Sequence, residues 1–248
     1  MTNARFYAFP GSEAVGSARY PRAGITLAAA GPMKAGRDGE NRARVFRSLA
    51  VAPDSVVALT QIHSRIVHVA ESAAPFRGLP EGDGILTRNR DLVPSVTVAD
   101  CMPIWLFDPV TGCFGVLHSG WKGTGIVRAA LELAREEWGA VSGNFRVILG
   151  PHIRSCCYTV DAERAEFFTR TFGPATVSTD SALLAAGNRW PYRLSLAEAN
   201  KALLAGQGVP AEHVLDVGEC TACDNVFGSN RREGPEAFTH MAAFIQMR

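Results

Sequence analysis

The stretch between Cys101 and His118 constrains the fold more than any other part of this sequence. Residues 104–107 and 113–117 are mostly apolar, and the segment between them contains aspartate, proline and glycine, which are typical of turns. This pattern predicts two antiparallel strands joined by a short loop. Because such a loop can differ in length by one residue, His118 should lie opposite residue 101 or 102. The sequence therefore predicts that a thiol and an imidazole meet at the open end of a hairpin.

A cysteine and a histidine held together in this way have three possible roles. Zinc in catalytic sites typically has three protein ligands and an open fourth position, and His63, Cys101 and His118 could supply the three. Alternatively, His118 could activate Cys101 as a nucleophile, as in cysteine hydrolases that act on amides. In the third interpretation Cys101 is only a small core residue, the common fate of a free cysteine. The spacing alone leaves all three open.

A glycine-rich segment follows His118 and leads into the clearest predicted helix. Apolar residues recur at helical spacing over residues 123–138, which predicts an amphipathic helix. Lys122 and Gly123 lie at its expected start, where unpaired backbone N–H groups and the helix dipole favour an anion such as phosphate. A plain helix start with a solvated lysine is the alternative.

Other polar residues could complete a site near the hairpin. Asp83 and Asp100 are candidates for a proton-transfer carboxylate, although each could cap a turn instead. Arg231 and Arg232 place two guanidinium groups in a polar loop, which is either a phosphate clamp or a solvated turn. Gln61, in the turn that contains His63, is a candidate substrate contact.

Four of the six cysteines form a separate pattern. Cys156 and Cys157 are adjacent, and Cys220 and Cys223 have C-x-x-C spacing. A four-thiolate zinc site is one interpretation, but adjacent cysteines are an unusual ligand spacing for structural zinc. Buried or redox-sensitive thiols are the other. We do not expect structural disulfides, because the sequence does not open with the apolar stretch of a secretion signal.

Composition narrows the class of partner. The 248 residues carry 25 basic and 24 acidic side chains, a net charge of +1, which gives no electrostatic reason for binding nucleic acid or an anionic membrane. No apolar stretch of the sequence reaches the length of a membrane span. No linker or change in composition divides residues 1–248. We therefore expect a cytoplasmic protein of one domain with small-molecule partners, and the sequence leaves its oligomeric state open.

The motifs together resemble the YfiH family, whose members have been called laccase-domain proteins or multicopper polyphenol oxidases. They follow one another in the family's order over most of the chain. The matching segments are Gln61–His63, Gly82–Thr87, Ala99–Pro103, His118–Thr124, Gly150–Val160, Cys220–Thr221 and Ser229–Arg232.

This resemblance implies an α+β fold of mixed β-sheets packed as a sandwich with helices outside. It implies a zinc ion held by His63, Cys101 and His118, and phosphorolysis of a purine nucleoside such as adenosine, inosine or methylthioadenosine, with adenosine deamination as a related activity. Purine nucleosides and phosphate are then the expected partners. The alternatives are a cysteine amidohydrolase or editing enzyme for peptidoglycan precursors, and a metal-binding interaction protein without turnover.

The laccase name can be tested by counting histidines. A blue-copper site takes two, and the trinuclear cluster of a multicopper oxidase needs about eight more. This chain has six. We therefore expect zinc rather than copper at the site, and we disfavour a polyphenol oxidase.

Overall fold

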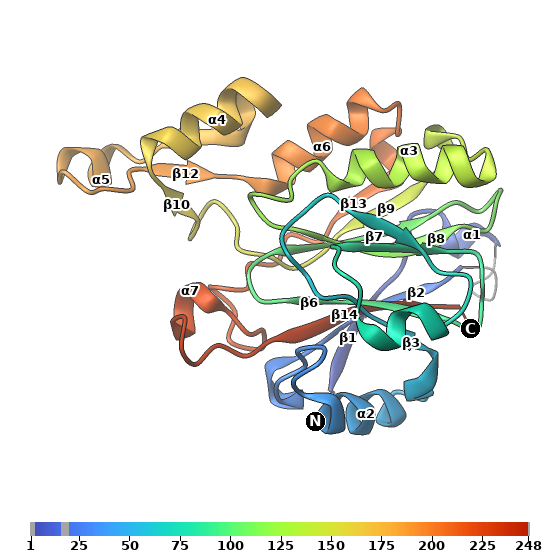
Figure 1. Ribbon diagram of the computed structural model, residues 1–248. Coiled ribbons are helices and arrows are strands. Elements are labelled where there is room, and N and C mark those ends of the chain that lie inside the picture. The colour runs from blue at the N-terminus through green and yellow to red at the C-terminus, as the bar shows by residue number, and fades with distance from the viewer. Residues whose placement is uncertain (1–2, 16–19, 248) are drawn as a thin grey trace.

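Two β-sheets packed face to face form the centre of the molecule (Figure 1). The computed structural model describes residues 3–15 and 20–247. In spatial order, one sheet contains β1 (Ala4–Tyr7), β2 (Arg22–Thr26), β14 (Met241–Gln246), β6 (Val93–Val98) and β3 (Val56–Val57). The other contains β13 (Val214–Asp216), β9 (Arg146–Leu149), β7 (Met102–Phe107), β8 (Phe114–Ser119), β5 (Gly84–Thr87) and β4 (Val67–Val69).

The described helices are α1 (Ser12–Val15), α2 (Gly39–Ser48), α3 (Ile126–Trp138), α4 (Ala162–Phe172), α5 (Ser181–Ala185), α6 (Leu196–Gly206) and α7 (Asn230–Glu233). Of these, α3 and α6 cover the outer face of the six-stranded sheet and α2 covers that of the five-stranded sheet (Figure 1). A small third sheet has the order β10 (Thr159–Val160), β12 (Tyr192–Leu194) and β11 (Val177–Thr179). With α4 and α5 it extends to one side of the sandwich (Figure 1). The α+β sandwich with helices outside, expected from the family resemblance, is confirmed.

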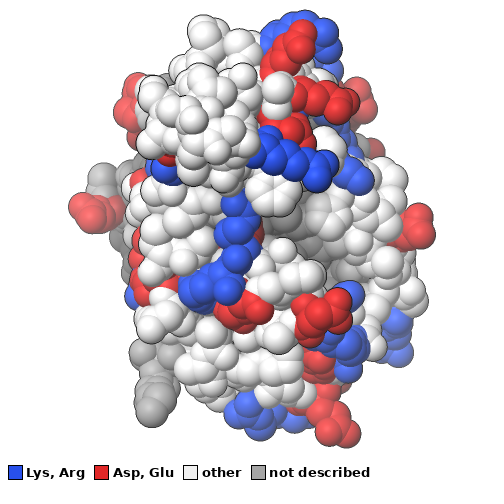
Figure 2. All heavy atoms as spheres, turned by 90° about the vertical axis from the view of Figure 1, so that its left-hand side faces the viewer, with Lys and Arg blue, Asp and Glu red and all other residues white. Residues whose placement is uncertain are grey.

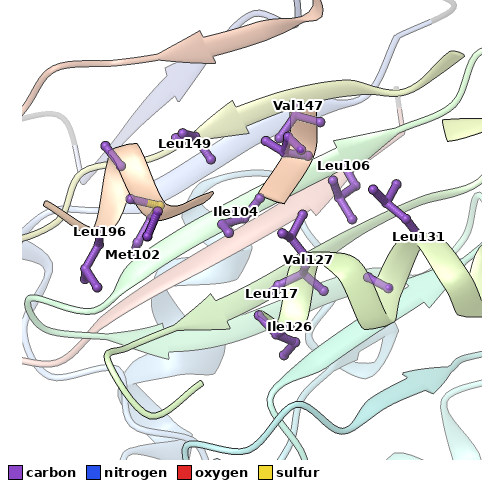
Figure 3. Packing of buried hydrophobic residues seen from close by; sticks show 14 of the residues in the cluster. Met102, Ile104, Leu106, Leu117, Ile126, Val127, Leu131, Val147, Leu149 and Leu196 are labelled. Atoms are coloured by element: carbon purple, nitrogen blue, oxygen red, sulfur yellow. The ribbon is translucent and has the colours of Figure 1, made fainter. Parts of the chain in front are cut away.

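Alternation of side chains along the strands explains this layering. Trp105 on β7 points into the space between the two sheets, whereas its neighbours Ile104 and Leu106 point to the opposite face. That opposite face packs against Val127 and Leu131 of α3 (Figure 3). Because successive strand residues face opposite sides, the run of apolar residues in β7 buries both faces of the sheet.

The predicted hairpin is β7 and β8, but its register differs from the prediction. His118 pairs with Pro103 rather than with residue 101 or 102. The returning strand begins at Phe114, one residue later than predicted. The reason is the longer loop, which Asp108 stabilises by accepting hydrogen bonds from two backbone N–H groups and a threonine hydroxyl within it.

The amphipathic helix begins later than predicted. Its first residue is Ile126 rather than residue 123. Gly125 has a φ of 111°, which lies outside the helical region, and Ile126 donates its N–H to the carbonyl of Gly123 in a turn. Lys122 and Gly123 therefore belong to the turn that precedes α3. Among the described residues, no helix has the length and apolar character needed to cross a membrane.

Candidate metal and catalytic site

Three potential metal ligands meet at the open end of the hairpin. His63, Cys101 and His118 offer a thiol and two imidazole nitrogens that all lie within 4.8 Å of one another. The two imidazole rings are 4.9 Å apart and nearly perpendicular. His118 is buried, Cys101 is half-buried and His63 is exposed. The structure thus brings together the three residues that the sequence and the resemblance grouped.

Asp83 orients both histidines from beneath the site. Its carboxylate is fully buried and lies 2.8 Å from Nδ1 of His118. It also accepts hydrogen bonds from the backbone N–H groups of His63 at 3.1 Å and Ser64 at 2.6 Å. Burial alone would raise the pKa of Asp83, but these hydrogen bonds lower it to about 2. An ionised carboxylate behind a histidine is the common arrangement at zinc sites, because it fixes the ring and increases its basicity.

The charges of Cys101 and His118 depend on each other. Burial raises the pKa of Cys101, but His118 and His63 lower it further, to about 6. Burial lowers the pKa of His118, but Cys101 and Asp83 raise it to about 9. Each residue therefore favours the charged form of the other, a thiolate beside an imidazolium. A thiolate is the form of cysteine that binds metals and attacks electrophiles.

Unusual backbone conformations allow this close approach. His63 has a φ of 59° and Asp100 a φ of 77°, in the left-handed region that residues other than glycine rarely adopt. Gly120 lies against the thiol, and a Cβ atom there would come within 2.8 Å of Sγ of Cys101. Left-handed conformations of residues other than glycine cost about 1–3 kcal/mol each and cluster at functional sites. Gly120, two residues after His118, is therefore required by packing around the thiol.

The three donors open into a cavity of about 590 Å³, a volume typical of small-molecule sites. Its walls come from distant parts of the sequence, from Lys34 to His240. The aromatic rings of Trp121 and Tyr158 also line it. Figure 2 shows the side of the molecule that carries α7, where basic side chains form a band beside a hollow in the surface.

Two arginines in the cavity wall carry positive charge. The guanidinium of Arg164 lies 4.2 Å from the centre of the Trp121 ring, and its Nε is buried without a hydrogen-bond partner in the described structure. Arg231 donates to the carbonyl of Cys157 at 2.9 Å and to the hydroxyl of Thr159 at 3.2 Å. Nothing in the sequence singled out Arg164, because it stands on the polar side of a helix whose neighbours become evident only after folding.

Two of the other candidates line the cavity but already have partners. The side-chain amide of Gln61 is paired with the backbone of Thr97, donating at 2.8 Å and accepting at 2.6 Å. The carboxylate of Asp100 accepts hydrogen bonds from the Thr221 hydroxyl at 2.6 Å and from the backbone N–H of Arg231 at 2.7 Å. Both residues therefore hold the cavity wall in place, and Asp100 is the carboxylate that borders the cavity.

Three of the predicted substrate contacts are absent from the described cavity lining: Lys122, Gly123 and Arg232. Lys122 is exposed and Gly123 is buried against other backbone atoms. Arg232 donates to the carbonyls of Thr221 and Asp224, so that it stabilises the loop before α7. The phosphate contact of Lys122 stays a prediction. The cavity lining itself contains the cationic side chains of Arg164 and Arg231.

Comparison with known proteins identifies the family. Residues 34–248 match the family model described as multi-copper polyphenol oxidoreductase laccase. The chain belongs to this family. A crystal structure of the hypothetical protein YfiH from Bacillus licheniformis superposes with a TM-score of 0.81 and 26% identity, covering 92% of this chain and 93% of that one. The resemblance to the YfiH family is confirmed.

Two curated relatives carry the names of nucleoside enzymes. The purine nucleoside phosphorylase YlmD from Geobacillus stearothermophilus is 29% identical over 217 residues, covering 84% of this chain and 78% of the relative. The adenosine deaminase RL5, from an unknown prokaryotic organism, is 30% identical over 207 residues, covering 78% of this chain and 76% of the relative.

The donors of this family member suit one metal ion better than a laccase's coppers. Among the described residues, the groups of three or more donors are this His₂Cys group and a separate group of four cysteines. No described group combines the many imidazoles of a trinuclear copper cluster. Two imidazoles and a thiolate, with a carboxylate behind one imidazole, fit a single ion with an open position facing the cavity.

Proposed function

We propose that the protein is a zinc-dependent purine nucleoside phosphorylase. The observation that carries this proposal is the His63, Cys101 and His118 group, which opens into a cavity that also contains two arginines. Relatives named for this activity support it. Zinc would be held by these three residues, and when bound it would supply a Lewis acid with one free position.

Arg164 and Arg231 are the proposed phosphate-binding residues. Both guanidinium groups line the same cavity as the donors, and guanidinium pairs with phosphate oxygens through two parallel hydrogen bonds. Arg164 also has a buried Nε without a partner in the described structure, which a bound anion would satisfy. The proposed phosphate site is therefore in the cavity wall, whereas the sequence had predicted it at Lys122.

The cavity also contains aromatic rings and one carboxylate, which are the proposed contacts of the nucleoside. Trp121, Tyr158 and Phe238 line the cavity and could stack on a purine, as aromatic side chains commonly do with bases. Asp100 borders the cavity, whereas Asp83 lies beneath the histidines. We assign proton transfer to Asp100 and the orientation of His118 to Asp83.

A second candidate is adenosine deamination, which would use the same cavity. It is favoured by the open side of the donor group and by the relative named adenosine deaminase. Deamination needs no phosphate, so the two activities can be separated by withholding it.

The test is turnover of inosine and adenosine by metal-quantified protein with and without phosphate. We expect release of the free base only when phosphate is present, and an increase of about tenfold or more in the KM for phosphate in Arg164→Ala. Lys122→Ala is the matched control, since it removes an exposed cation outside the described cavity lining. Release of the free base at the same rate without phosphate would overturn the proposal. So would a larger increase in the KM for phosphate in Lys122→Ala than in Arg164→Ala.

A further inference from the structure

Four cysteines from two distant segments meet outside the site already described. Cys156 and Cys157 lie in the turn before β10, and Cys220 and Cys223 lie in the turn after β13. Their sulfur atoms all lie within 4.8 Å of one another. Sγ of Cys223 is 3.5 Å from Sγ of Cys156 and 3.3 Å from Sγ of Cys157.

These distances are too long for disulfides and short enough for one ion to reach all four sulfur atoms. A disulfide joins its sulfurs at about 2.05 Å. Tetrahedral zinc with Zn–S bonds of about 2.3 Å places its thiolates roughly 3.8 Å apart. The separations of 3.3 Å and 3.5 Å from Cys223 are within about 0.5 Å of this value, and all four sulfur atoms lie within 4.8 Å of one another. The adjacent cysteines, an unusual spacing in the sequence, both reach the group because they lie on one turn.

Backbone N–H groups donate hydrogen bonds to one of the four sulfur atoms. Sγ of Cys220 accepts the N–H of Arg154 at 3.4 Å. It also accepts backbone N–H groups of Ala222 and Cys223, the second and third residues after it. A C-x-x-C turn whose first sulfur accepts N–H groups from within the turn presents both sulfurs to the same side.

Positive charge surrounds the four sulfurs. Arg154 lies close enough to stabilise negative charge on Cys156 and Cys220. Arg193 donates to the carbonyl of Cys156 at 2.6 Å and Arg231 to the carbonyl of Cys157 at 2.9 Å. Four thiolates around a divalent ion carry a net negative charge, which these guanidinium groups would offset.

We propose that Cys156, Cys157, Cys220 and Cys223 bind a second zinc ion in a closed, structural site. Four thiolate ligands select a soft or borderline ion with tetrahedral geometry, for which zinc is the common choice. Binding displaces the thiol protons, and the free energy of binding adds to the free energy of folding. This proposal is independent of the proposed nucleoside activity.

The ion would join two parts of the cavity wall. Tyr158, directly after Cys157, and Arg231 both line the cavity. Thr221, directly after Cys220, donates to Asp100, the neighbour of Cys101. Loss of the ion should therefore loosen the wall without touching the His63, Cys101 and His118 group.

The experiment measures zinc per chain in protein purified under reducing conditions without added metal. The starting variant, His63→Ala with Cys101→Ala, lacks the first site, and we expect it to retain about one equivalent of zinc. Adding Cys220→Ser should remove that equivalent, whereas adding Cys113→Ala, which removes a buried thiol outside the group, should not. Circular dichroism checks folding in each case.

Cobalt substitution keeps the test valid if Cys220→Ser does not fold. Cobalt bound to the starting variant should show the visible absorption of a tetrahedral thiolate site, and this absorption should weaken in the exposed-cysteine variant Cys156→Ser. A starting variant free of metal, or without the cobalt bands, would overturn the proposal. So would a disulfide between two of the four cysteines in the freshly purified protein, detected by intact mass.

Discussion

The two thiol-containing groups differ in burial, in their neighbours and in the number of ligands that they offer. Cys101 shares its group with two imidazoles, stands before the buried carboxylate of Asp83, and faces a cavity. The four-cysteine group lies near the surface, where Cys156 and Cys223 are exposed, and its neighbours are backbone N–H groups and arginines. Three ligands leave room for a substrate, whereas four thiolates close the coordination shell. Under the two proposals, cysteine would serve chemistry in one group and architecture in the other.

The largest effect should come from removing a buried ligand from the three-residue group, which tests whether that group alone carries the chemistry. We expect His118→Ala to lower nucleoside turnover by more than about 100-fold, because losing a ligand should exceed the 10- to 100-fold loss typical of an outer partner. Steady-state kinetics at saturating phosphate measure the effect. The four-cysteine group should retain its metal in this variant. Turnover within tenfold of the wild-type rate would contradict the assignment of His118.

Asp83 should matter through the histidines rather than through direct contact with substrate. His118 and Ser64 contact different oxygens of the carboxylate, so in Asp83→Asn the amide NH₂ can no longer accept one of these two hydrogen bonds. We expect metal affinity at the three-residue group to fall by about 10- to 100-fold. Competition with a chromophoric chelator gives the affinity, and Asp91→Asn, at an exposed turn, is the control. Equal affinity in the two variants would mean that Asp83 serves folding alone.

Alkylation of the metal-free protein should sharpen the contrast between the groups. The pKa of Cys101 is about 6, lowered by the histidines against the effect of burial, whereas burial and neighbouring thiols raise the pKa of Cys156 to about 11. At pH 7 we expect the half-buried Cys101 to react with iodoacetamide about tenfold or more faster than the exposed Cys156, because the thiolate is the reactive form. Mass spectrometry of short reactions resolves the two sites.

The same labelling separates zinc binding from the hydrolase alternative. Cys101 should resist alkylation while metal is bound and react after chelation. Rapid labelling of Cys101 in metal-loaded protein would favour a nucleophilic cysteine, as in the amidohydrolase interpretation.

The smallest effect concerns the ion pairs that support the four-cysteine group. Asp216 pairs with Arg154 at 2.6 Å and with Lys201 at 3.0 Å, and these partners lower its pKa although burial alone would raise it. A lowered carboxyl pKa contributes stability above the unfolded-state value of about 3.9, and this contribution is lost as the pH falls. Because Lys201 and Arg154 are partly exposed, we expect Asp216→Asn to cost only about 1 kcal/mol at pH 7.

Chemical denaturation of wild type and Asp216→Asn between pH 7 and pH 3 measures this contribution. The difference in unfolding free energy should narrow as the pH falls through 4. Glu132→Gln, which breaks an exposed pair with Arg128, should have a smaller effect at every pH. A difference that stays constant with pH would show that Asp216 acts through packing.

Much of the metal group could be predicted because local patterns determine it. The hairpin is a short-range structure, so the turn residues between Cys101 and His118 sufficed to bring them together, with an error of one position in the register. His63 was a candidate ligand without a spacing argument until the family resemblance supported it, because it reaches the group from a different part of the chain. The spacing of cysteines predicted which thiols could cluster, but their geometry depends on how the turns before β10 and after β13 pack.

The cavity wall could not be predicted from sequence patterns. Arg164 lies on α4 and becomes important only where that helix passes Trp121. Lys122 had the better local signal, since it stands in a glycine-rich segment, yet a turn before α3 leaves it exposed. Local propensity therefore located the strands and the helix, whereas the direction of long cationic side chains depended on tertiary packing.

Because the cavity is lined by residues from Lys34 to His240, nearly the whole chain must be in place before a substrate can bind. A ligand that binds only the complete cavity stabilises the folded state by RT ln(1 + [L]/Kd), where [L] is the concentration of free ligand. Catalytic activity is then a sensitive reporter of intact tertiary structure. A proteolytic cut or a local opening at either end of the chain should abolish turnover before the sandwich itself unfolds.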